Sequence, residues 1–377
     1  MEKELPGGKA TVSIPRGLPA NTRRVVAVDA RVLTQTGKGV PRFLYETLRR
    51  LALRPEFKLI LFSNRPLHMD NVLPIETVVD TAWRRVPGSI WMLARLNQLA
   101  KGAGADTLWG PSHVLPTKSR GLRTIVTVHD LVHRLMPETM DRWNRFVSRR
   151  LVDGSIRRAD RIVAVSNTTG DDMVALLGIA RSRIDVVRLG VRFVKTPVPA
   201  SATTPDGYLF VLGSIEPRKN ISGLLDCFAS LQRSLPGLSL RLTGAHSWSQ
   251  SATLRQIRNN DACTILGFLT DADVTAQMAG ARAFVIPSHY EGFGLPIVEA
   301  VGLAPVIAAD IPIFRELAEA IDGIHFVDFG NPDAAAASIA TFLASDPAPA
   351  NFRTGAADEL NWDTVADRYA VILDDRD

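Results

Sequence analysis

Short apolar runs alternate with longer segments of helical periodicity through most of this chain. In the first half, the pattern predicts strands at 24–29, 57–62, 106–109, 124–129 and 161–165, and helices at 40–53, 89–101 and 142–157. Strands that alternate with helices form a parallel sheet, because each crossover helix returns the chain to the same end of the sheet. The first half therefore reads as an α/β domain.

A segment rich in Pro, Ser and Thr interrupts this alternation and has the composition of an interdomain linker. The alternation then resumes, with strands predicted at 208–213, 238–243 and 284–288, a helix at 220–235, and a final amphipathic helix at 361–373. The predicted organisation is a disordered tail at 1–22, a first domain at 23–190, a linker at 191–207, a second domain at 208–360, and a C-terminal helix at 361–377 that packs back towards the first domain.

Composition narrows the class of protein. A length of 377 residues suits two domains, and 46% hydrophobic with 22% charged residues is typical of a globular protein. No uncharged apolar run reaches roughly 18 residues, and the N-terminus lacks the apolar core of a signal peptide, so we expect a cytoplasmic protein. Cys227 and Cys263 stand far apart, which argues against a disulfide framework or a cysteine-based zinc site.

Charge is divided unevenly between the halves. Residues 1–190 contain 31 Lys and Arg against 17 Asp and Glu, whereas residues 191–377 contain 13 against 22. A basic half predicts an anionic partner, and solvated helix faces are the alternative explanation. Two stretches, at 83–99 and 142–150, mix aromatic and aliphatic residues with arginine. They favour peripheral contact with the inner face of an anionic membrane, although helices packed on a sheet give the same pattern.

The most informative motif runs from Glu291 to Glu299 and reads Glu-Gly-Phe-Gly-Leu-Pro-Ile-Val-Glu. It predicts a glycine loop that enters a helix, with Pro296 in the first turn. Backbone N–H groups at 293–295 would then face an anion such as a phosphate. Because a predicted strand precedes the loop, Glu291 is expected at the carboxyl end of a parallel strand, where open α/β sheets bind ligands.

Two further segments are expected at the same edge of the second sheet. Gly213 ends a predicted strand and is followed by Arg218 and Lys219, two cations that suit a diphosphate. The turn with Gly267 and Phe268 can present backbone groups to a nucleobase, although a plain turn explains it equally well.

The first domain contributes one candidate of its own. Its predicted strand at 124–129 ends in His129, which Asp130 follows. A histidine at the carboxyl end of a buried strand is a candidate for a reaction centre, and a purely structural histidine is the alternative.

These motifs, together with the loop of Gly37 and Gly39, resemble glycosyltransferase family 4 in their order and spacing over almost the whole chain. The family consists of retaining enzymes of the GT-B fold. The resemblance therefore implies an α/β protein with two Rossmann-like, doubly wound domains that face a central cleft. The first domain would bind the acceptor and the second the nucleotide sugar.

The resemblance also implies roles for individual residues. Arg218 and Lys219 would hold the donor's diphosphate, and Glu299 the ribose. Glu291 would contact the transferred sugar, and His129 would line the reaction centre. No metal or other cofactor is implied, since cations and backbone N–H groups neutralise the leaving diphosphate. The residues assigned to catalysis or donor binding are Gly39, His129, Gly213, Arg218, Lys219, Gly267, Phe268, Glu291, Phe293, Gly294, Leu295 and Glu299.

The spacing of the two glutamates agrees with separate roles. Eight helical residues rise about 12 Å, whereas the carboxyl groups of a retaining glycosidase stand about 5–5.5 Å apart. Glu291 and Glu299 are therefore expected to bind a nucleotide sugar at two separate points along its length. One departure from the family affects the acceptor side, because Pro41 and Arg42 replace the small or apolar residues expected in the first loop.

The motifs indicate the identity of the donor and the acceptor less clearly than the type of reaction. A resemblance to the mannosyltransferases of bacterial surface-polysaccharide assembly favours GDP-mannose, and UDP-glucose, UDP-galactose or UDP-N-acetylglucosamine are the alternatives. The acceptor is expected to be a growing or polyprenyl-diphosphate-linked glycan. A GT-B-fold nucleotide-sugar epimerase is the alternative from another class. Nucleic acid is not an expected partner, because no recognition motif accompanies the basic residues.

Overall fold

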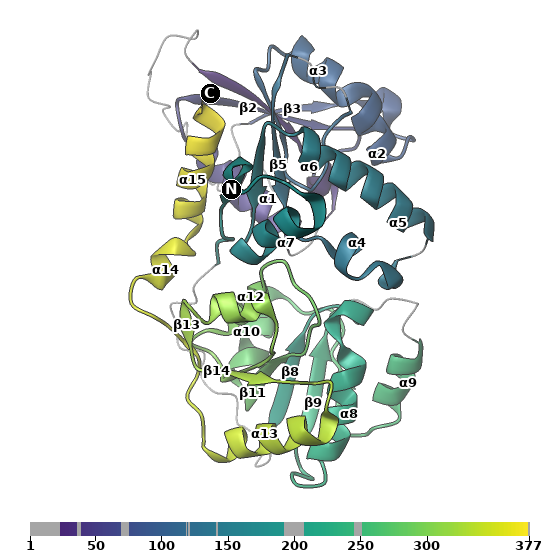
Figure 1. The fold of residues 1–377 in the computed structure, drawn as a ribbon, viewed down its shortest axis with the longest axis vertical. Helices are drawn as coiled ribbons and strands as arrows, with labels where there is room; N and C mark the ends of the chain where they lie inside the picture. The colour runs from purple at the N-terminus through teal and green to yellow at the C-terminus, as the bar shows by residue number, and fades with distance from the viewer. Residues whose placement is uncertain are drawn as a thin grey trace, which may run out of the picture.

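The computed structural model describes residues 23–35, 39–68, 75–117, 119, 121–140, 142–191, 207–244 and 251–375. The expected tail at 1–22 and nearly all of the expected linker lie outside these residues. The described chain forms two α/β halves, and its last helix returns to the first half (Figure 1).

The N-terminal half is built on a seven-stranded sheet in the order β3-β2-β1-β4-β5-β6-β7. All neighbouring strands run parallel. The order reverses between β1 and β4, and such a switch point leaves a crevice outside the carboxyl ends of the strands. In chain order the strands are β1 (Arg24–Asp29), β2 (Phe57–Ser63), β3 (Glu76–Val79), β4 (Thr107–Gly110), β5 (Arg123–Val128), β6 (Arg161–Ala164) and β7 (Ile184–Val186).

Helices connect these strands. Two predicted helices are interrupted by π-helical turns, at Met92–Leu96 and Arg149–Asp153. Asp153, in the second turn, is buried and pairs with His133 and Arg134. The helices of this half are α1 (Val40–Leu51), α2 (Gly88–Trp91), α3 (Asn97–Gly102), α4 (Val132–Leu135), α5 (Arg142–Ser148), α6 (Gly154–Arg158) and α7 (Asn167–Leu177).

The C-terminal half repeats the same topology. Its six-stranded parallel sheet has the order β10-β9-β8-β11-β12-β14, with the switch point between β8 and β11. Both halves are thus Rossmann-like, as the family resemblance implied, and their sheets are parallel, as the strand alternation predicted. The strands are β8 (Tyr208–Leu212), β9 (Ser239–Thr243), β10 (Cys263–Ile265), β11 (Ala283–Ile286), β12 (Val306–Ala309) and β14 (Ile324–Val327), with a small antiparallel pair β13 (Ile321–Asp322) and β15 (Asn351–Phe352).

The helices of this half cover both faces of its sheet (Figure 1). Helix α8 ends at Leu231 rather than at the predicted residue 235, close to Pro236, which cannot continue a helix. The helices of this half are α8 (Ile221–Leu231), α9 (Ser251–Arg258), α10 (Asp271–Ala279), α11 (Leu295–Ala300), α12 (Pro312–Leu317), α13 (Pro332–Ala344) and α14 (Ala356–Glu359), and α15 (Trp362–Asp374) follows them.

Helix α15 packs on the N-terminal half. Tyr369 is fully buried there, 2.9 Å from the Thr127 hydroxyl and with its ring 5.0 Å from that of Trp109. At the end of the helix, Arg123 donates a hydrogen bond to the Ile372 carbonyl at 2.8 Å. One apolar core consequently runs from the C-terminal half through α15 to one face of the first sheet, while the other face of that sheet has its own core.

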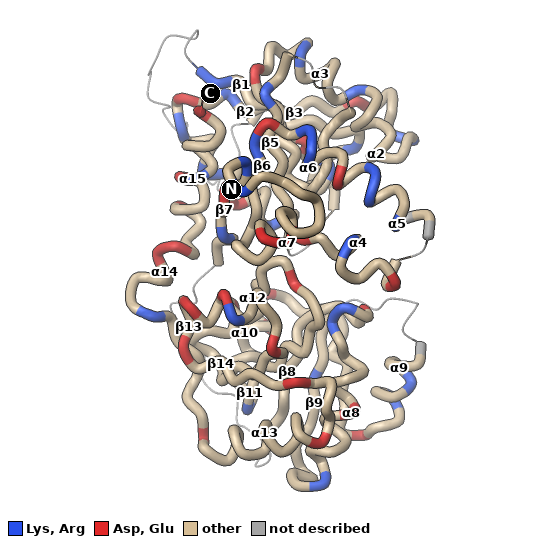
Figure 2. Tube along the Cα trace, in the orientation of Figure 1, with Lys and Arg blue, Asp and Glu red and all other residues tan. Residues whose placement is uncertain are grey.

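The charge asymmetry of the sequence is visible in space. Figure 2 shows Lys and Arg gathered mainly along the N-terminal half, where β1, β5 and α5 lie. Acidic positions are spread over both halves.

Candidate active site

A cleft of about 510 Å³ lies between the two halves, at the carboxyl ends of their strands. Segments after β5, β8 and β11 reach it, so the switch point of the second sheet opens into it. Of the sequence-predicted site residues, those that line it are Gly39, His129, Gly213, Arg218, Lys219, Glu291, Phe268, Phe293, Gly294, Leu295 and Glu299.

Gly267 is the one predicted residue that does not line the cleft. Its carbonyl oxygen accepts a hydrogen bond from the Thr243 hydroxyl at 2.6 Å, which holds the turn beside β9. Phe268 follows it and is 90% exposed. Gly37, from the first loop, lies outside the described residues.

The lining residues that the sequence did not indicate include Gly244 and Trp362. Gly244 directly follows β9, and a glycine at the carboxyl end of a strand could have indicated it. Trp362 begins α15 and packs against Gly190, where an added Cβ would lie 2.4 Å from its ring. The sequence around Trp362 does not indicate this contact, because the contact forms only when α15 packs back on the N-terminal half.

Glu291 is the centre of a buried charge cluster. Only 7% of the residue is exposed. Its carboxylate accepts hydrogen bonds from the Arg218 guanidinium at 3.1 Å, from the Ser288 hydroxyl at 2.8 Å, and from the Lys219 ammonium. The two predicted phosphate-binding cations and the predicted sugar-binding carboxylate are therefore in direct contact.

The cations of this cluster keep donors for a ligand. Arg218 also donates to Glu216 at 3.0 Å. Burial lowers the pKa of Arg218, but Glu291, Glu216 and Asp130 outweigh burial and leave the pKa raised, so the guanidinium stays charged. Because a guanidinium has five N–H donors and an ammonium three, Arg218 and Lys219 can bind an anion while they hold Glu291.

Local sequence explains how these cations are presented. Pro217 opens a single 3-10 turn, Pro217–Lys219, which its fixed φ favours. Asn220 then adopts the left-handed conformation at φ 51°, and its side chain caps α8 by accepting from the Gly223 N–H at 3.3 Å. Asparagine tolerates this conformation better than most residues. The turn and the cap together aim Arg218 and Lys219 at the cleft.

Two glycines shape the loop that carries Glu291. Gly292 lies against the first half so closely that an added Cβ would stand 1.6 Å from the His129 carbonyl oxygen. Gly294 has φ 87° and precedes α11, whose second residue is Pro296. Among the described residues, no oxygen accepts a hydrogen bond from the backbone N–H groups of Phe293 and Leu295. These groups therefore have no partner within the part of the chain that the structure describes, and their binding of an anion stays a prediction.

His129 faces this loop from the first half. It follows β5 directly, and its ring lies 5.1 Å from that of Phe43 and 5.3 Å from that of His113. Burial lowers the pKa of His129 to about 3, and His113 adds to the effect. The ring is therefore neutral. Since Nε2 lies 2.8 Å from the Pro111 carbonyl oxygen, which can only accept, Nε2 carries the proton. Nδ1 is then an acceptor, and no donor within the described residues forms a hydrogen bond with it.

Glu299 lies on α11 and pairs with the opposite half. Arg42, from α1, donates to its carboxylate at 3.3 Å and lies 3.7 Å from Asp271. Arg42 is one of the residues of the first loop that depart from the family pattern, and its side chain reaches two carboxylates of the other half. The two glutamates are thus held by different cations, Glu291 by its own half and Glu299 by the other.

Two family models match the sequence. A family model described as glycosyltransferase family 4 matches residues 37–193, and one described as glycosyl transferases group 1 matches residues 198–359. The chain is 26% identical over 337 residues to O-antigen chain mannosyltransferase B of Escherichia coli. The aligned region covers 82% of this chain and 87% of that protein. It is 30% identical over 230 residues to glycogen synthase of Mycobacterium tuberculosis, covering 58% and 54% of the two chains.

Among solved structures, the fold is similar to that of Anabaena Alr3699/HepE in complex with UDP and glucose. The TM-score is 0.63 at 19% identity, over 94% of this chain and 100% of the other. The two family models together match most of the sequence, and the paired Rossmann-like halves have the matching architecture. The chain therefore belongs to glycosyltransferase family 4 and is a glycosyltransferase of the GT-B fold.

Proposed function

We propose that this protein transfers a hexose, mannose from GDP-mannose, to a lipid-linked or growing surface glycan with retention of the anomeric configuration. The observation that carries the proposal is the buried cluster of Arg218, Lys219 and Glu291 at the switch point of the second sheet, opposite His129. A nucleoside diphosphate that lies in this cleft would place its phosphates on the two cations and the sugar next to Glu291.

The described residues supply what the leaving diphosphate needs. Arg218, Lys219 and the N–H groups of Phe293 and Leu295 would stabilise the negative charge that develops on it. Nδ1 of His129 can accept a hydrogen bond from a sugar hydroxyl, and it cannot act as an acid near neutral pH because the ring is neutral. A phosphate oxygen on the same face would help to deprotonate the acceptor hydroxyl. We propose that no metal takes part, so turnover should survive a chelator.

The similarity to an O-antigen mannosyltransferase of E. coli over most of both chains supports mannose. UDP-sugars remain the alternative donors, and HepE, with UDP and glucose bound, is a structural neighbour of that kind. Turnover should therefore be measured across a panel of GDP-mannose, UDP-glucose, UDP-galactose and UDP-N-acetylglucosamine. Activity with UDP-sugars alone would refute the mannose assignment, and an inverted product would refute retention.

A nucleotide-sugar epimerase of the same fold would also use this cleft. The two activities differ in their need for an acceptor. Release of the nucleoside diphosphate that depends on an added glycan supports transfer, whereas conversion of the donor without an acceptor supports epimerisation.

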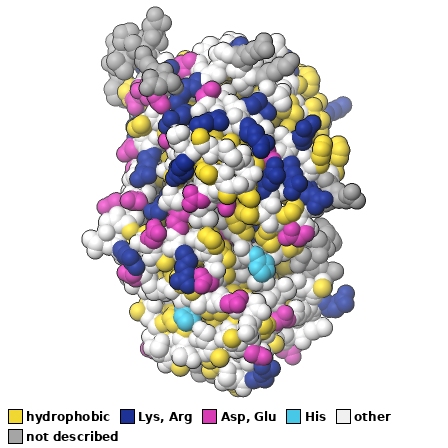
Figure 3. Space-filling model, viewed as in Figure 1, with side chains coloured by type: hydrophobic (Ala, Val, Ile, Leu, Met, Phe, Trp, Pro, Cys, Tyr) yellow, Lys and Arg dark blue, Asp and Glu magenta, His cyan; other side chains and the backbone are white. Residues whose placement is uncertain are grey.

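We also propose peripheral contact with an anionic membrane through α5. Trp143 and Phe146 are 71% and 55% exposed, with ring centroids 6.3 Å apart, and the Arg150 guanidinium lies 5.8 Å from the Phe146 ring. Figure 3 shows apolar and basic side chains side by side on this half. An aromatic and basic helix face is typical of interfacial binding. No helix in the described residues is long and apolar enough to cross a bilayer.

Vesicle flotation tests this contact. The wild-type chain should float with vesicles that contain anionic lipid, and Trp143→Ser with Phe146→Ser should abolish flotation. Leu53→Ser is a matched control, because Leu53 is an apolar residue that is 75% exposed and lies just after α1, outside α5. If the wild-type chain did not float with anionic vesicles at low salt, the proposed membrane contact would be contradicted.

A further inference from the structure

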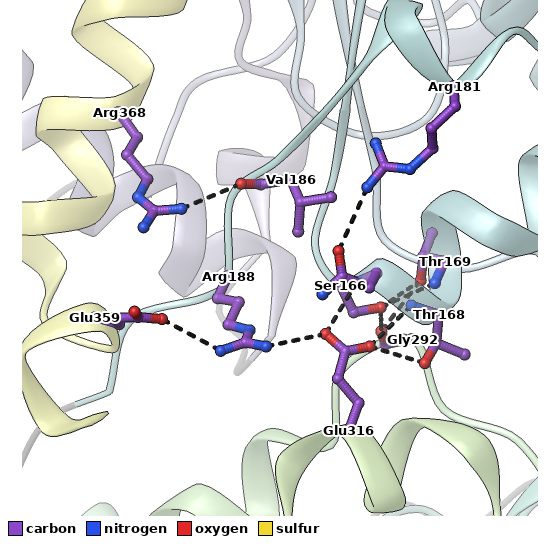
Figure 4. A network of polar contacts seen from close by, with 11 residues as sticks. Ser166, Thr168, Thr169, Arg181, Val186, Arg188, Gly292, Glu316, Glu359 and Arg368 are labelled. Atoms are coloured by element: carbon purple, nitrogen blue, oxygen red, sulfur yellow. Dashed lines mark hydrogen bonds and ion pairs between the residues drawn. The ribbon is translucent and has the colours of Figure 1, made fainter. Parts of the chain in front are cut away.

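Helix α7 contacts the loop that carries Glu291. Ser166, the residue before the helix, and Thr169, in its first turn, both direct hydroxyl groups at the carbonyl oxygen of Gly292, at 2.7 and 3.1 Å (Figure 4). Both side chains are fully buried. The Ser166 hydroxyl also accepts from the Thr169 N–H at 3.0 Å and so caps the helix.

The same helix also contacts the residue on the other side of Glu291. The Tyr290 hydroxyl donates to Asp172 on α7 at 3.2 Å and accepts from the Leu131 N–H at 2.9 Å. Tyr290 and Gly292 flank Glu291 in the sequence. The residues on both sides of Glu291 are therefore held by the opposite half, Tyr290 through its side chain and Gly292 through its backbone carbonyl.

A second segment of the C-terminal half fixes the position of α7. Glu316, on α12, accepts from the N–H groups of Asn167 and Thr168 at 3.0 and 2.8 Å, and from the Thr168 hydroxyl at 2.8 Å (Figure 4). Arg188 donates to the same carboxylate at 3.4 Å and to Glu359 at 3.2 Å. A carboxylate at the first turn of a helix takes up free N–H groups and interacts favourably with the helix dipole.

The geometry of the peptide bond links these contacts to the donor. A trans peptide is planar, so its C=O and N–H groups point in opposite directions. The Gly292 carbonyl points at α7, and the Phe293 N–H, which shares its peptide plane, therefore points away from α7. Phe293 lines the cleft. A hydroxyl group on one half thus sets the direction of an N–H donor on the other.

We infer that Ser166 and Thr169 are positioning residues for the donor loop, and that Glu316 maintains the contact between the halves on which they depend. The donor site of the C-terminal half is then completed by the N-terminal half. Donor affinity should depend on side chains that never touch the donor. The inference uses one part of the proposed function, namely that a nucleoside diphosphate binds in the cleft.

Thr169→Val is the sharpest test, because it removes the hydroxyl and keeps the shape. Loss of one buried hydrogen bond should weaken nucleoside diphosphate binding on the order of tenfold, raise KM for the donor more than it lowers kcat, and speed amide hydrogen exchange at 291–295. Thr169→Ser should restore all three. Thr341→Val is the control, since its hydroxyl bonds to Ala337 within α13. Unchanged exchange and affinity in Thr169→Val would overturn the inference.

Glu316→Gln tests the contact between the halves. An amide cannot accept all four hydrogen bonds that reach the Glu316 carboxylate, because its NH₂ group would face hydrogen-bond donors. Faster exchange at 291–295 and a larger radius of gyration by X-ray scattering are expected, and wild-type values for both would count against the inference. Hydrogen exchange needs no ligand. If the wild-type chain bound no nucleoside diphosphate, the proposed function would fail while the exchange data still decided the positioning role.

Discussion

At the scale of single residues, Glu291 has two roles, and the sequence indicated only the first. It is a candidate sugar contact, and it is the counter-ion of Arg218 and Lys219. Removal of one partner of a buried ion pair leaves uncompensated charge and costs about 3–5 kcal/mol. Glu291→Ala is therefore expected to reduce stability as well as transfer, and Glu291→Gln is the cleaner variant.

We expect Glu291→Gln to lose transfer on the order of a hundredfold or more while it binds nucleoside diphosphate at least as tightly as the wild type. The two cations no longer share a carboxylate and are free for the phosphates. Calorimetry and turnover measure the two effects separately. Normal turnover in this variant would remove Glu291 from the mechanism.

The buried His129 ring makes stability sensitive to acid. Burial lowers its pKa from 6.5 to about 3, so between these values the unfolded chain binds a proton that the folded chain does not. Stability must therefore fall as the pH falls through this window. Between pH 7 and pH 5 the ring should contribute a loss of roughly 2 kcal/mol.

Urea unfolding at pH 7 and pH 5 checks this expectation. His129→Gln should reduce the loss of stability on acidification, because its side chain does not titrate and can still donate to the Pro111 carbonyl. His289→Gln, at an exposed position, should leave the loss unchanged. An equal loss in all three proteins would show that His129 does not titrate in this way.

At the scale of elements, α15 is part of the N-terminal core although it ends the chain. Tyr369 is fully buried between Phe43 and Trp109, with ring centroids at 5.6 and 5.0 Å. Tyr369→Ala should cost about 3–5 kcal/mol, whereas Val371→Ala, at a residue that is 72% exposed, should cost little. Urea unfolding measures both. A small loss for Tyr369→Ala would mean that α15 contributes little to that core.

Local sequence predicted much at this scale. The positions of most strands, the turn at Arg218 and Lys219, and the start of α11 at Leu295 followed from periodicity, proline and glycine, whereas β3, β7, β14 and α7 were not predicted. Contacts that join distant segments did not follow. Arg42 on Glu299, the α7 hydroxyls on Gly292, and Trp362 beside the cleft depend on how the halves meet, which no local pattern encodes.

At the scale of the whole molecule, two Rossmann-like sheets place their carboxyl edges on either side of one cleft. The second half carries the cations, and the first half contributes His129 and the side chains that hold the loop of Glu291. The aromatic and basic face of α5 lies on the first half, which would receive the acceptor. A lipid-linked acceptor would then reach the cleft from the membrane side.

The central claim is that this cleft binds a nucleoside diphosphate through Arg218 and Lys219. Calorimetric titration of GDP and UDP into the wild-type chain and into a variant with Arg218→Gln and Lys219→Met tests it most directly. We predict that the wild type binds at least one of the two, and that the variant binds it on the order of a hundredfold more weakly. Equal affinity in both proteins, or no binding of either nucleotide by the wild type, would contradict the claim.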